Sequence, residues 1–473
     1  MSAYTTNDLP VVVIGGGPVG LAAAAHLLEQ GLEPLVLEAG DDVAAAVRSW
    51  AHVRLFSPWE YDVDAAAARL LEPTGWRSPD GTALPTGREL VDRYLAPLAA
   101  TPQLAPRIRT GTRVVAVSRV GVDKTRTVGR EGRAYLVRTI VDGRVEDLTA
   151  RSVIDASGTW DQPNPLGAAG LPAVGEADSG RWLVGPLPDV AGADRARFAG
   201  RHTLVVGMGH SAANTLLGLV ELQKTAPGTR ISWAIRGHSP ARLYGGGDSD
   251  GLPARGLLGS TLKAAVQAGH VELHREVTLT ELAPTGDGQL QVTGEGRDGA
   301  PLTLAVDAVA AATGFRPDLD MLREVRLSLD PSVQAPARLA PLIDPNFHSC
   351  GTVPPHGHRD LAHPDESFYL VGMKSYGRAP TFLLATGYEQ VRSIAAALAG
   401  DLEAADSVQL NLPSTGVCST DLGDREAAKA AGAAGAGFAT GSEHGYAGEQ
   451  PAAASCCGTA PQLVTIGAPP SSC

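Results

Sequence analysis

Cysteine, aromatic residues and long apolar runs are all scarce in this chain. Five of the 473 residues are cysteine, and 5% are aromatic. The cysteines are odd in number and crowded toward the C-terminus, which excludes the disulfide framework of a small secreted protein. No Cys-x-x-Cys or Cys-x4-Cys pair occurs. The sequence therefore argues against disulfide-reductase chemistry through a redox-active cysteine pair.

Excess positive charge is absent as well. The formal net charge is -12, which argues against a broad nucleic-acid-binding surface, because such surfaces gather Lys and Arg. No apolar stretch reaches the roughly 18 to 20 residues that span a bilayer. Residues 1–10 lack the pattern of a secretory signal. We expect a cytoplasmic protein with no nucleic-acid or membrane partner, and a homodimer is the candidate assembly.

Glycine is abundant, and it forms two turns of the same kind. The first, at residues 15–20, follows the apolar strand 11–14 and opens a helix that ends near Gln30. In such a turn the first glycine bends the chain, the second admits a pyrophosphate and the third allows close helix–strand packing. Glu38 closes the next strand, where a carboxylate binds an adenosine ribose and favours FAD or NAD over NADP. The candidates here are Gly15, Gly17, Pro18, Gly20 and Glu38.

The second turn, at residues 207–212, follows the apolar strand 203–206 and opens a helix of roughly 211–224. The next strand, 231–235, is followed by Arg236, and a guanidinium there pairs with the 2′-phosphate of NADPH. Two such turns argue for two dinucleotides and for electron transfer between them. The pattern predicts an α/β fold with two doubly wound, Rossmann-like domains. The candidates here are Gly207, Gly209, His210, Ser211, Ala212 and Arg236.

Three further segments are interpreted as parts of the cofactor sites. Two strands, within 151–160 and 309–317, end in a hydroxyl residue and glycine, where a bulky side chain would collide with a cofactor. For either one alone, an ordinary strand-to-loop transition is the alternative. A helix at 386–398 is a candidate to direct its N-terminal N–H groups at a flavin, and an ordinary core helix is the alternative. The candidates are Ala156, Ser157, Gly158, Thr313, Gly314, Thr386 and Gly387.

The order of these features resembles that of the class B flavoprotein monooxygenases and their thioredoxin-reductase-like relatives over roughly residues 9–400. The resemblance implies an NADPH domain inserted into an FAD domain. It gives an FAD domain at 1–165 and 316–412, a connecting segment at 166–197 and an NADPH domain at 198–315. Residues 413–473, rich in Ala, Gly, Ser and Pro, are predicted to form a flexible tail.

Stretches 50–59, 346–357 and 373–381 resemble more narrowly the flavin-dependent monooxygenases of actinobacterial arsenic-resistance clusters. That resemblance implies FAD and NADPH as cofactors and a small substrate, with a trivalent arsenical as the candidate. Arg48 and Trp50 join the cofactor-binding candidates. Cys350, Lys374 and Tyr376 are the catalytic candidates. The vicinal tail thiols Cys456 and Cys457 are candidate arsenic(III) ligands, by analogy with the vicinal pair that ends mercuric reductases.

One departure from the family pattern opens alternatives. Class B monooxygenases carry a Phe-x-Gly-x-x-x-His motif before the second turn, and Phe198 and Gly200 match it, but Leu204 stands at the histidine position. This favours an NADPH-dependent reductase or oxidase without oxygen insertion as the alternative enzyme. A metalloid-binding flavoprotein that uses its tail cysteines is the non-enzymatic alternative. In the folded part, a histidine-rich loop around Cys350 matches no standard zinc spacing, and an ordinary solvated loop is its simpler interpretation.

Overall fold

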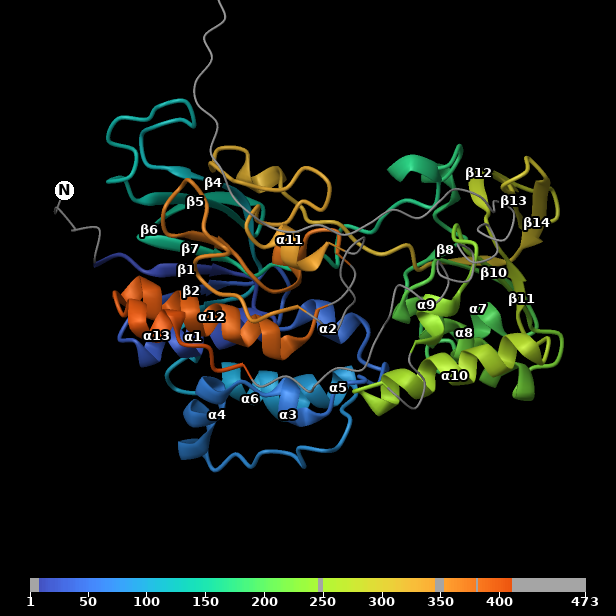
Figure 1. Ribbon diagram of the computed structural model, residues 1–473, viewed down its shortest axis with the longest axis horizontal. Coiled ribbons are helices and arrows are strands. Elements are labelled where there is room, and N and C mark those ends of the chain that lie inside the picture. The colour runs from blue at the N-terminus through green and yellow to red at the C-terminus, as the bar shows by residue number, and fades with distance from the viewer. Residues whose placement is uncertain (1–7, 246–249, 345–352, 380–381, 411–473) are drawn as a thin grey trace, which may run out of the picture. The chain divides into compact units, whose positions relative to one another are not determined.

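The computed structural model describes residues 8–245, 250–344, 353–379 and 382–410. Cys350, Cys456 and Cys457, together with the predicted tail, lie outside these ranges. The sixteen strands in the described ranges form four sheets, two of them parallel and two antiparallel. Figure 1 shows the elements with their labels.

The first parallel sheet has the strand order β16-β7-β1-β2-β3, with every neighbouring pair parallel. In chain order this is 3-2-1-4-5 read from the other edge, the doubly wound order of dinucleotide-binding folds. The predicted strands 11–14 and 34–37 are confirmed as β1 and β2. The strands are β1 Val11–Ile14, β2 Pro34–Leu37, β3 Ile108–Arg109, β7 Ser152–Asp155 and β16 Phe368–Leu370.

The second parallel sheet has the order β11-β10-β9-β15-β8. Its strands β9, β10, β11 and β15 are arranged as β1, β2, β3 and β7 are in the first sheet. The edge strand β8 differs, because it precedes β9 in the chain. The predicted strands 203–206 and 231–235 correspond to β9 and β10. The strands are β8 Leu183–Val184, β9 His202–Val206, β10 Arg230–Ala234, β11 Glu272–His274 and β15 Ala308–Ala311.

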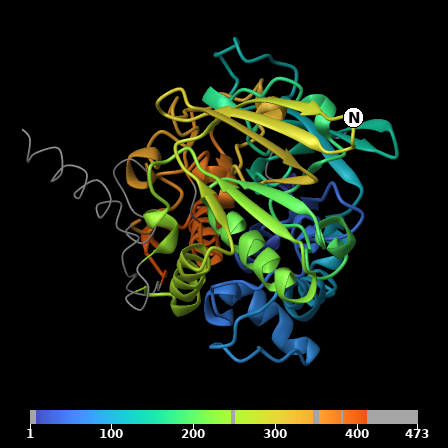
Figure 2. The same ribbon diagram turned by 90° about the vertical axis from the view of Figure 1, so that its right-hand side faces the viewer.

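Each parallel sheet has helices on one face and a three-stranded antiparallel sheet on the other (Figures 1 and 2). Side chains along β1 point alternately to the two faces of the sheet. Val11 and Val13 pack with the helices, while Val12 and Ile14 pack with β4–β6. In Figure 2 the yellow strands β12–β14 lie on one side of the second sheet and the green helix α8 on the other. The antiparallel strands are β4 Thr112–Arg119, β5 Tyr135–Val141, β6 Arg144–Ala150, β12 Thr278–Pro284, β13 Leu290–Glu295 and β14 Pro301–Val306.

Helices α1 and α12 cover the first sheet, and α8 and α10 cover the second (Figure 1). Gly31 and Gly400 follow α1 and α12 with φ of 70° and 90°, the left-handed backbone that glycine adopts readily. The two helices end close to the predicted positions, near Gln30 and at residue 398. The helices are α1 Pro18–Glu29, α2 Ala45–Ser49, α3 Trp59–Asp62, α4 Ala65–Leu71, α5 Gly87–Leu90, α6 Ala96–Ala99, α7 Arg195–Phe198, α8 His210–Thr225, α9 Ala241–Tyr244, α10 Pro253–Gln267, α11 Ala340–Ile343, α12 Leu384–Ala399 and α13 Leu402–Asp406.

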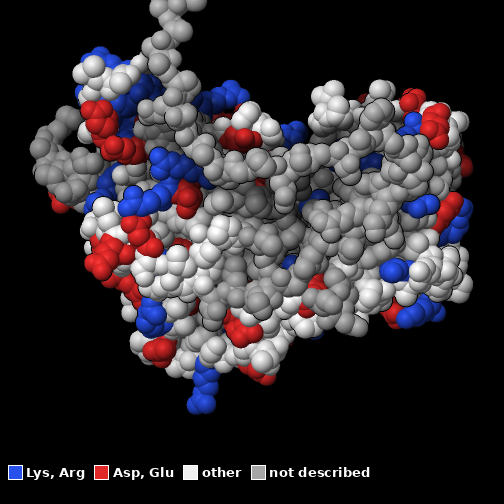
Figure 3. All heavy atoms as spheres, viewed as in Figure 1, with Lys and Arg blue, Asp and Glu red and all other residues white. Residues whose placement is uncertain are grey.

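The chain passes from the first sheet to the second and back. Strands β1 to β7 precede the second sheet, and β16 returns to pair with β7. The α/β fold and two-domain arrangement are thereby confirmed, whereas the residue boundaries of the domains stay a prediction. No helix within the described ranges is long and apolar enough to cross a membrane. On the face shown in Figure 3, the described acidic and basic side chains are interspersed.

Candidate cofactor sites

The first glycine turn joins β1 to α1 beside the end of β7, where the strand order reverses. Gly15 has φ of 100°, and a Cβ there would lie 2.8 Å from the carbonyl oxygen of Ala156. A Cβ at Gly20 would lie 1.9 Å from the carbonyl oxygen of Gly15. At Gly17, by contrast, a Cβ would meet nothing within 4 Å. The outer glycines are thus required by packing, and the middle one borders open space where a pyrophosphate fits.

Helix α1 presents the N–H groups of its first turn to that space. Gly17 is its N-cap and Pro18 its first residue, and no side chain caps the helix. Unbonded N–H groups and the helix dipole favour an anion at this end. The geometry of the turn and the uncapped helix fit the pyrophosphate of FAD.

Glu38 stands at the end of β2 and holds the turn. Its Oε2 accepts a hydrogen bond from the N–H of Gly16 at 2.7 Å, and its Oε1 accepts one from the N–H of Gly40 at 2.8 Å. A carboxylate has about four acceptor positions. Acceptor capacity therefore remains for ribose hydroxyls, and Glu38 positions the turn as well as being the predicted ribose ligand.

Arg48 and Trp50 lie at the end of the short helix α2. The Arg48 guanidinium contacts Asp42 at 2.9 Å and donates from Nε to the carbonyl of Val43 at 3.1 Å. A Cβ at Gly87 would come within 2.9 Å of the Trp50 ring, so ring and glycine are in close contact. In the described residues, Arg48 is held near the Glu38 loop and Trp50 near the start of α5.

At the end of β7, a buried ion pair supports the predicted strand end 156–158. The Nζ of Lys374 lies 2.7 Å from Oδ2 of Asp155 and donates to Oγ of Ser157 at 3.0 Å. Both charged side chains are 0% exposed. Lys374, a catalytic candidate from sequence, thus anchors the segment after β16 to the end of β7. Removing either partner would leave a buried charge without compensation.

Tyr376, the second described catalytic candidate, is packed among aromatic rings. Its ring centroid lies 5.3 Å from that of Phe382 and 5.7 Å from that of His356. Burial raises the pKa of the Tyr376 hydroxyl above its usual value. The phenol therefore keeps its proton at neutral pH. Its role in the reaction stays a prediction.

Helix α12 begins earlier than the sequence indicates. It starts at Leu384, two residues before the predicted start, because Leu383 adopts extended backbone as the N-cap. The N–H groups of Thr386 and Gly387 donate to the carbonyl of Leu383. The first turn of this helix therefore begins at Leu384 and includes Thr386, and the orientation of its N–H groups toward a flavin stays a prediction. A Cβ at Gly387 would lie 2.7 Å from a Val19 methyl, which requires glycine where α12 meets α1.

The second turn repeats the geometry of the first. Gly207 has φ of 125°, and a Cβ there would lie 2.0 Å from the carbonyl oxygen of Ala312, at the end of β15. A Cβ at Gly209 would meet nothing within 4 Å. Gly209 is the N-cap of α8, again without a side-chain cap, and Ala212 is fully buried. This second switch point therefore fits a second dinucleotide.

His210 and Ser211 begin α8 at this turn. The His210 ring lies 5.0 Å from the ring of Phe56, which comes from the first domain's chain segment. Burial, helped by the nearby Arg255 charge, lowers the pKa of His210 to about 4. The imidazole is consequently neutral at physiological pH, and it adds no positive charge to the turn.

Arg236 and the end of β15 complete the second site. Arg236 is exposed, and no hydrogen bond or ion pair joins its side chain to another described residue. Its guanidinium is available for a phosphate. Thr313 donates from Oγ1 to the carbonyl of Asn164, and Asn164 donates from Nδ2 to the carbonyl of Thr313 at 3.2 Å. Gly314, with φ of 84°, lies beside this crossing.

The described histidines of the loop near Cys350 take part in separate interactions. His356 lies 2.9 Å from Nε2 of Gln390, and His358 lies 3.0 Å from Oδ1 of Asp406. The ring of His363 accepts from the N–H of Ser328 at 3.2 Å. Within the described ranges, no three His, Cys, Asp or Glu side chains are grouped to hold a metal ion.

Comparison with known proteins identifies the family to which the chain belongs. A profile of the pyridine nucleotide-disulphide oxidoreductase family matches residues 12–338. The chain belongs to this family. It is accordingly a flavin-dependent oxidoreductase that uses a pyridine nucleotide, in agreement with the predicted FAD and NADPH. The family's name refers to a disulphide, yet the sequence contains no closely spaced cysteine pair near either turn.

Solved structures share the fold of this family member. The bacillithiol disulfide reductase from Bacillus cereus is 22% identical, with a TM-score of 0.59, over 83% of this chain and 99% of that chain. An ornithine N-hydroxylase from Kutzneria sp. 744 is 16% identical, with a TM-score of 0.58, over 84% and 99%. The cadaverine monooxygenase from Erwinia amylovora, bound to FAD, is 14% identical, with a TM-score of 0.58, over 86% and 98%.

Sequence reasoning missed several residues that shape these sites. The Asp155–Lys374 pair joins residues 219 positions apart, and Asn164 meets Thr313 across 149 positions. Neither pairing leaves a local pattern. The hydroxyl residue at Ser157 was the one local signal near Asp155, and it was interpreted as a cofactor contact rather than as a partner for a lysine.

Proposed function

We propose that this oxidoreductase is an FAD-dependent, NADPH-oxidising monooxygenase that acts on a small molecule. The observation that carries the proposal is the repeated turn geometry. At both switch points the middle glycine borders open space and the following helix lacks a side-chain cap. Two anion-binding helix ends in one chain support two dinucleotides.

Different residues bind the cofactors at the two sites. When bound, FAD supplies the redox chemistry between NADPH and the final acceptor. Glu38 binds the ribose at the first site and keeps the turn in place through Gly16. At the second site, Arg236 binds the 2′-phosphate of NADPH, and neutral His210 packs against Phe56.

The first experiment asks whether the two cofactors work together. Purified protein should be yellow, and NADPH added without oxygen should bleach its flavin absorbance. Admitting oxygen with substrate should then yield an oxygenated product in proportion to the NADPH consumed. A colourless protein that cannot be reconstituted with FAD would contradict the proposal.

One observation favours a reductase or oxidase as the second candidate. Leu204 lies in β9, fully buried, where class B monooxygenases carry a histidine. A buried leucine supplies no hydrogen bond or charge. If NADPH consumption yields hydrogen peroxide in place of an oxygenated product with every substrate offered, this second candidate is correct.

We propose a trivalent arsenical as the substrate class, on the strength of the resemblance at 50–59, 346–357 and 373–381. NADPH oxidation should be measured with arsenite, methylated trivalent arsenicals, sulfides and amines. Cys350→Ser should lower turnover at saturating arsenical. Truncation after Leu412, which removes Cys456 and Cys457, should lower turnover at low arsenical concentration only. If neither change affects any arsenical, the thiols have no part in the reaction.

A further inference from the structure

A pocket opens at the edge of the second sheet opposite its glycine turn. Trp182, Arg201 and Asp307 immediately precede β8, β9 and β15, three neighbouring parallel strands. Their side chains therefore gather at the amino ends of these strands. The glycine turn follows the carboxyl end of β9, about 16 Å away along a five-residue strand. The pocket and the nucleotide site are at opposite ends of the same strands.

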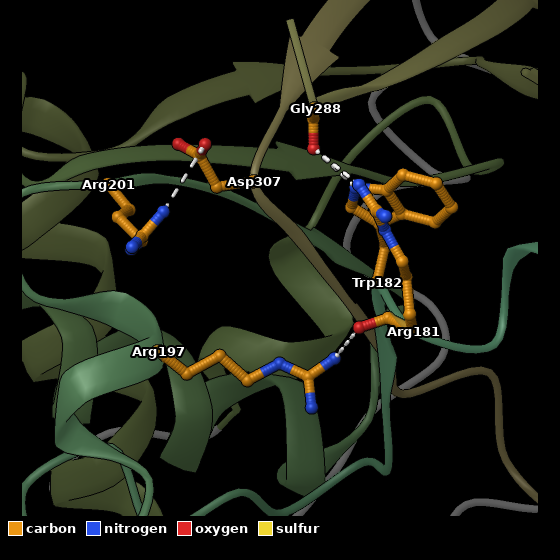
Figure 4. A pocket seen from close by; sticks show the side chains of 6 residues that line it. All are labelled: Arg181, Trp182, Arg197, Arg201, Gly288 and Asp307. Atoms are coloured by element: carbon orange, nitrogen blue, oxygen red, sulfur yellow. Dashed lines mark hydrogen bonds and ion pairs between the residues drawn. The ribbon is translucent and has the colours of Figure 1, made fainter. Parts of the chain in front are cut away.

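The pocket is small and strongly basic. Its volume is about 260 Å³, somewhat below the usual range for drug-sized ligands. Figure 4 shows three arginines around it, from the segment before β8, from α7 and from the start of β9, with one carboxylate among them. The lining residues are Arg181, Trp182, Arg197, Arg201, Gly288 and Asp307.

Backbone carbonyls and an aromatic face hold two of these guanidiniums. Arg197 donates from Nη2 to the carbonyls of Arg181 and Leu183. Arg181 donates to the carbonyl of Gly288 at 3.1 Å and stacks 3.9 Å from the centroid of the Trp182 ring. Neutral partners orient a guanidinium without cancelling its charge, so the remaining N–H groups can bind an anion.

The single carboxylate of the pocket is already engaged. Oδ2 of Asp307 accepts from the N–H of His202 at 2.8 Å, and its Oδ1 accepts from Nε2 of Gln289 at 3.3 Å. Arg201, whose side chain is 55% exposed, reaches Asp307 only at 3.9 Å. Among the described residues, none of the three guanidiniums has a carboxylate within hydrogen-bond distance.

Two arginines elsewhere in this acidic chain each have a close carboxylate partner. Arg138 meets Asp147 at 2.7 Å and Arg359 meets Asp406 at 2.6 Å, both as two-point contacts at the surface. In contrast to these two surface pairs, the pocket arginines keep positive charge that no close carboxylate among the described residues neutralises. Three arginines against one engaged acid leave about two net positive charges around the cavity.

We propose that this pocket binds a small phosphate-bearing anion at a site separate from both cofactors. Phosphate matches the planar, multi-donor guanidinium and carries the two negative charges that the lining leaves uncompensated. The cavity is large enough for an inorganic phosphate or for the phosphate group of a small metabolite. Because its walls include the residues that begin β8, β9 and β15, the ligand is placed to stabilise the sheet that carries the second glycine turn.

Calorimetric titration of the full chain tests the site. Inorganic phosphate and adenosine monophosphate are titrated at constant ionic strength into protein saturated with NADP+, so that the Arg236 site is filled. Both should bind if the pocket accepts a phosphate group, and the tighter ligand shows whether the source is free phosphate or a larger molecule. Absence of binding by both would overturn the proposal.

Two variants locate the binding. Arg201→Gln and Arg181→Gln should each weaken phosphate binding at least about 10-fold, since each removes a charge-assisted contact. Arg113→Gln, at an exposed position of β4, removes the same charge elsewhere and should leave binding unchanged. Both pocket arginines are exposed, so their loss should not unfold the protein, which thermal melting checks. Binding that survives in both pocket variants, or falls equally in Arg113→Gln, would place the anion elsewhere and refute the proposal.

Discussion

At the residue scale, the proposed cofactor preference depends on two polar side chains. Glu38 and Arg236 follow corresponding strands, β2 and β10, in the two parallel sheets. The acid is held by two backbone N–H groups, while the guanidinium has no partner among the described residues. In the proposed function, the two positions select different nucleotides by opposite charge.

Glu38→Ala should weaken FAD retention. A charge-assisted hydrogen bond contributes about 1.5 to 3 kcal/mol, so the dissociation constant for FAD should rise about 10- to 100-fold. Flavin content after gel filtration measures this. Glu146→Ala, an exposed acid on β6, is the control. Equal flavin content in the two variants would contradict the ribose assignment.

Arg236→Ala should raise the KM for NADPH about 10- to 100-fold and leave the KM for NADH nearly unchanged, because only NADPH carries the 2′-phosphate. Steady-state kinetics with both nucleotides measures the split. Arg230→Ala, at the exposed start of β10, is the matched control. Equal effects on the two nucleotides would refute the assignment.

Asp62, at the end of α3, makes stability depend on pH. The side chain is fully buried, and burial raises its pKa from 3.8 to about 7, although Ser57 donates to it at 2.8 Å. The folded state therefore binds this proton at a pH where the unfolded chain has released it. This contribution to stability should fall by about 1.4 kcal/mol per unit as pH rises from about 4 to about 7.

Asp62→Asn should remove that loss. Relative to the parent, the variant should gain stability with rising pH across this window and keep the gain above it. Urea unfolding at pH 5, 6 and 8 measures the difference. Asp178→Asn, at an exposed position, should show no such trend. If the parent and Asp62→Asn curves run parallel with pH, the buried acid does not titrate in this window.

At the scale of elements, different glycines of one turn serve folding and cofactor binding. Gly20→Ala forces a Cβ against the backbone oxygen of Gly15, which no side-chain movement relieves. It should destabilise the protein by about 3 kcal/mol and lower FAD content. Gly17→Val points into open space, so its melting temperature without flavin should match the parent while FAD binding is lost. A Gly17→Val protein that retains FAD would contradict the position of the pyrophosphate.

Elements with a strong local pattern could be predicted from the sequence, and elements without one could not. The elements β1, α1 and β2 follow from apolar runs bounded by glycine, a pattern contained within about 30 residues. The sequence predicts no element at the short helix α13, whose five residues are too few to show a helical period. The start of α12 was misplaced because Leu383, without a polar capping side chain, gives no start signal.

The polar features beyond the turns could not be found from one sequence. Asp155 and Lys374, or Arg201 and Asp307, become neighbours only when strands distant in the chain align. A local periodicity in the sequence carries no information about such long-range contacts. The sequence therefore locates cofactor turns, whose chemistry is local, and misses ion pairs and pockets that depend on topology.

At the scale of the whole molecule, a buried ion pair joins distant parts of the first domain. Arg130 and Asp365 meet at 2.8 Å with side chains 3% and 4% exposed, and Arg119 lies 3.9 Å from the same carboxylate. Although burial opposes it, Arg130 holds the pKa of Asp365 below its usual value. The acid therefore stays ionised and fastens the segment before β16 to the loop between β4 and β5.

Asp365→Ala should lower the free energy of unfolding by about 3 to 5 kcal/mol, because it strands buried arginines without a partner. Asp147→Ala breaks the exposed pair with Arg138 and should cost less than about 1 kcal/mol. Denaturant unfolding of both variants gives the comparison. Similar losses in the two would show that the buried pair contributes no more than a surface contact.

The return of β16 to β7 has a consequence for synthesis. The first sheet lacks its edge strand until Phe368–Leu370 leaves the ribosome, whereas the second sheet is complete once β15 has emerged. At about 5 to 20 residues per second, the roughly 200 residues between β7 and β16 take about 10 to 40 s to translate. The domain that begins later can therefore finish folding earlier. Throughout that interval the nascent N-terminal half has an exposed β7 edge that a chaperone could shield.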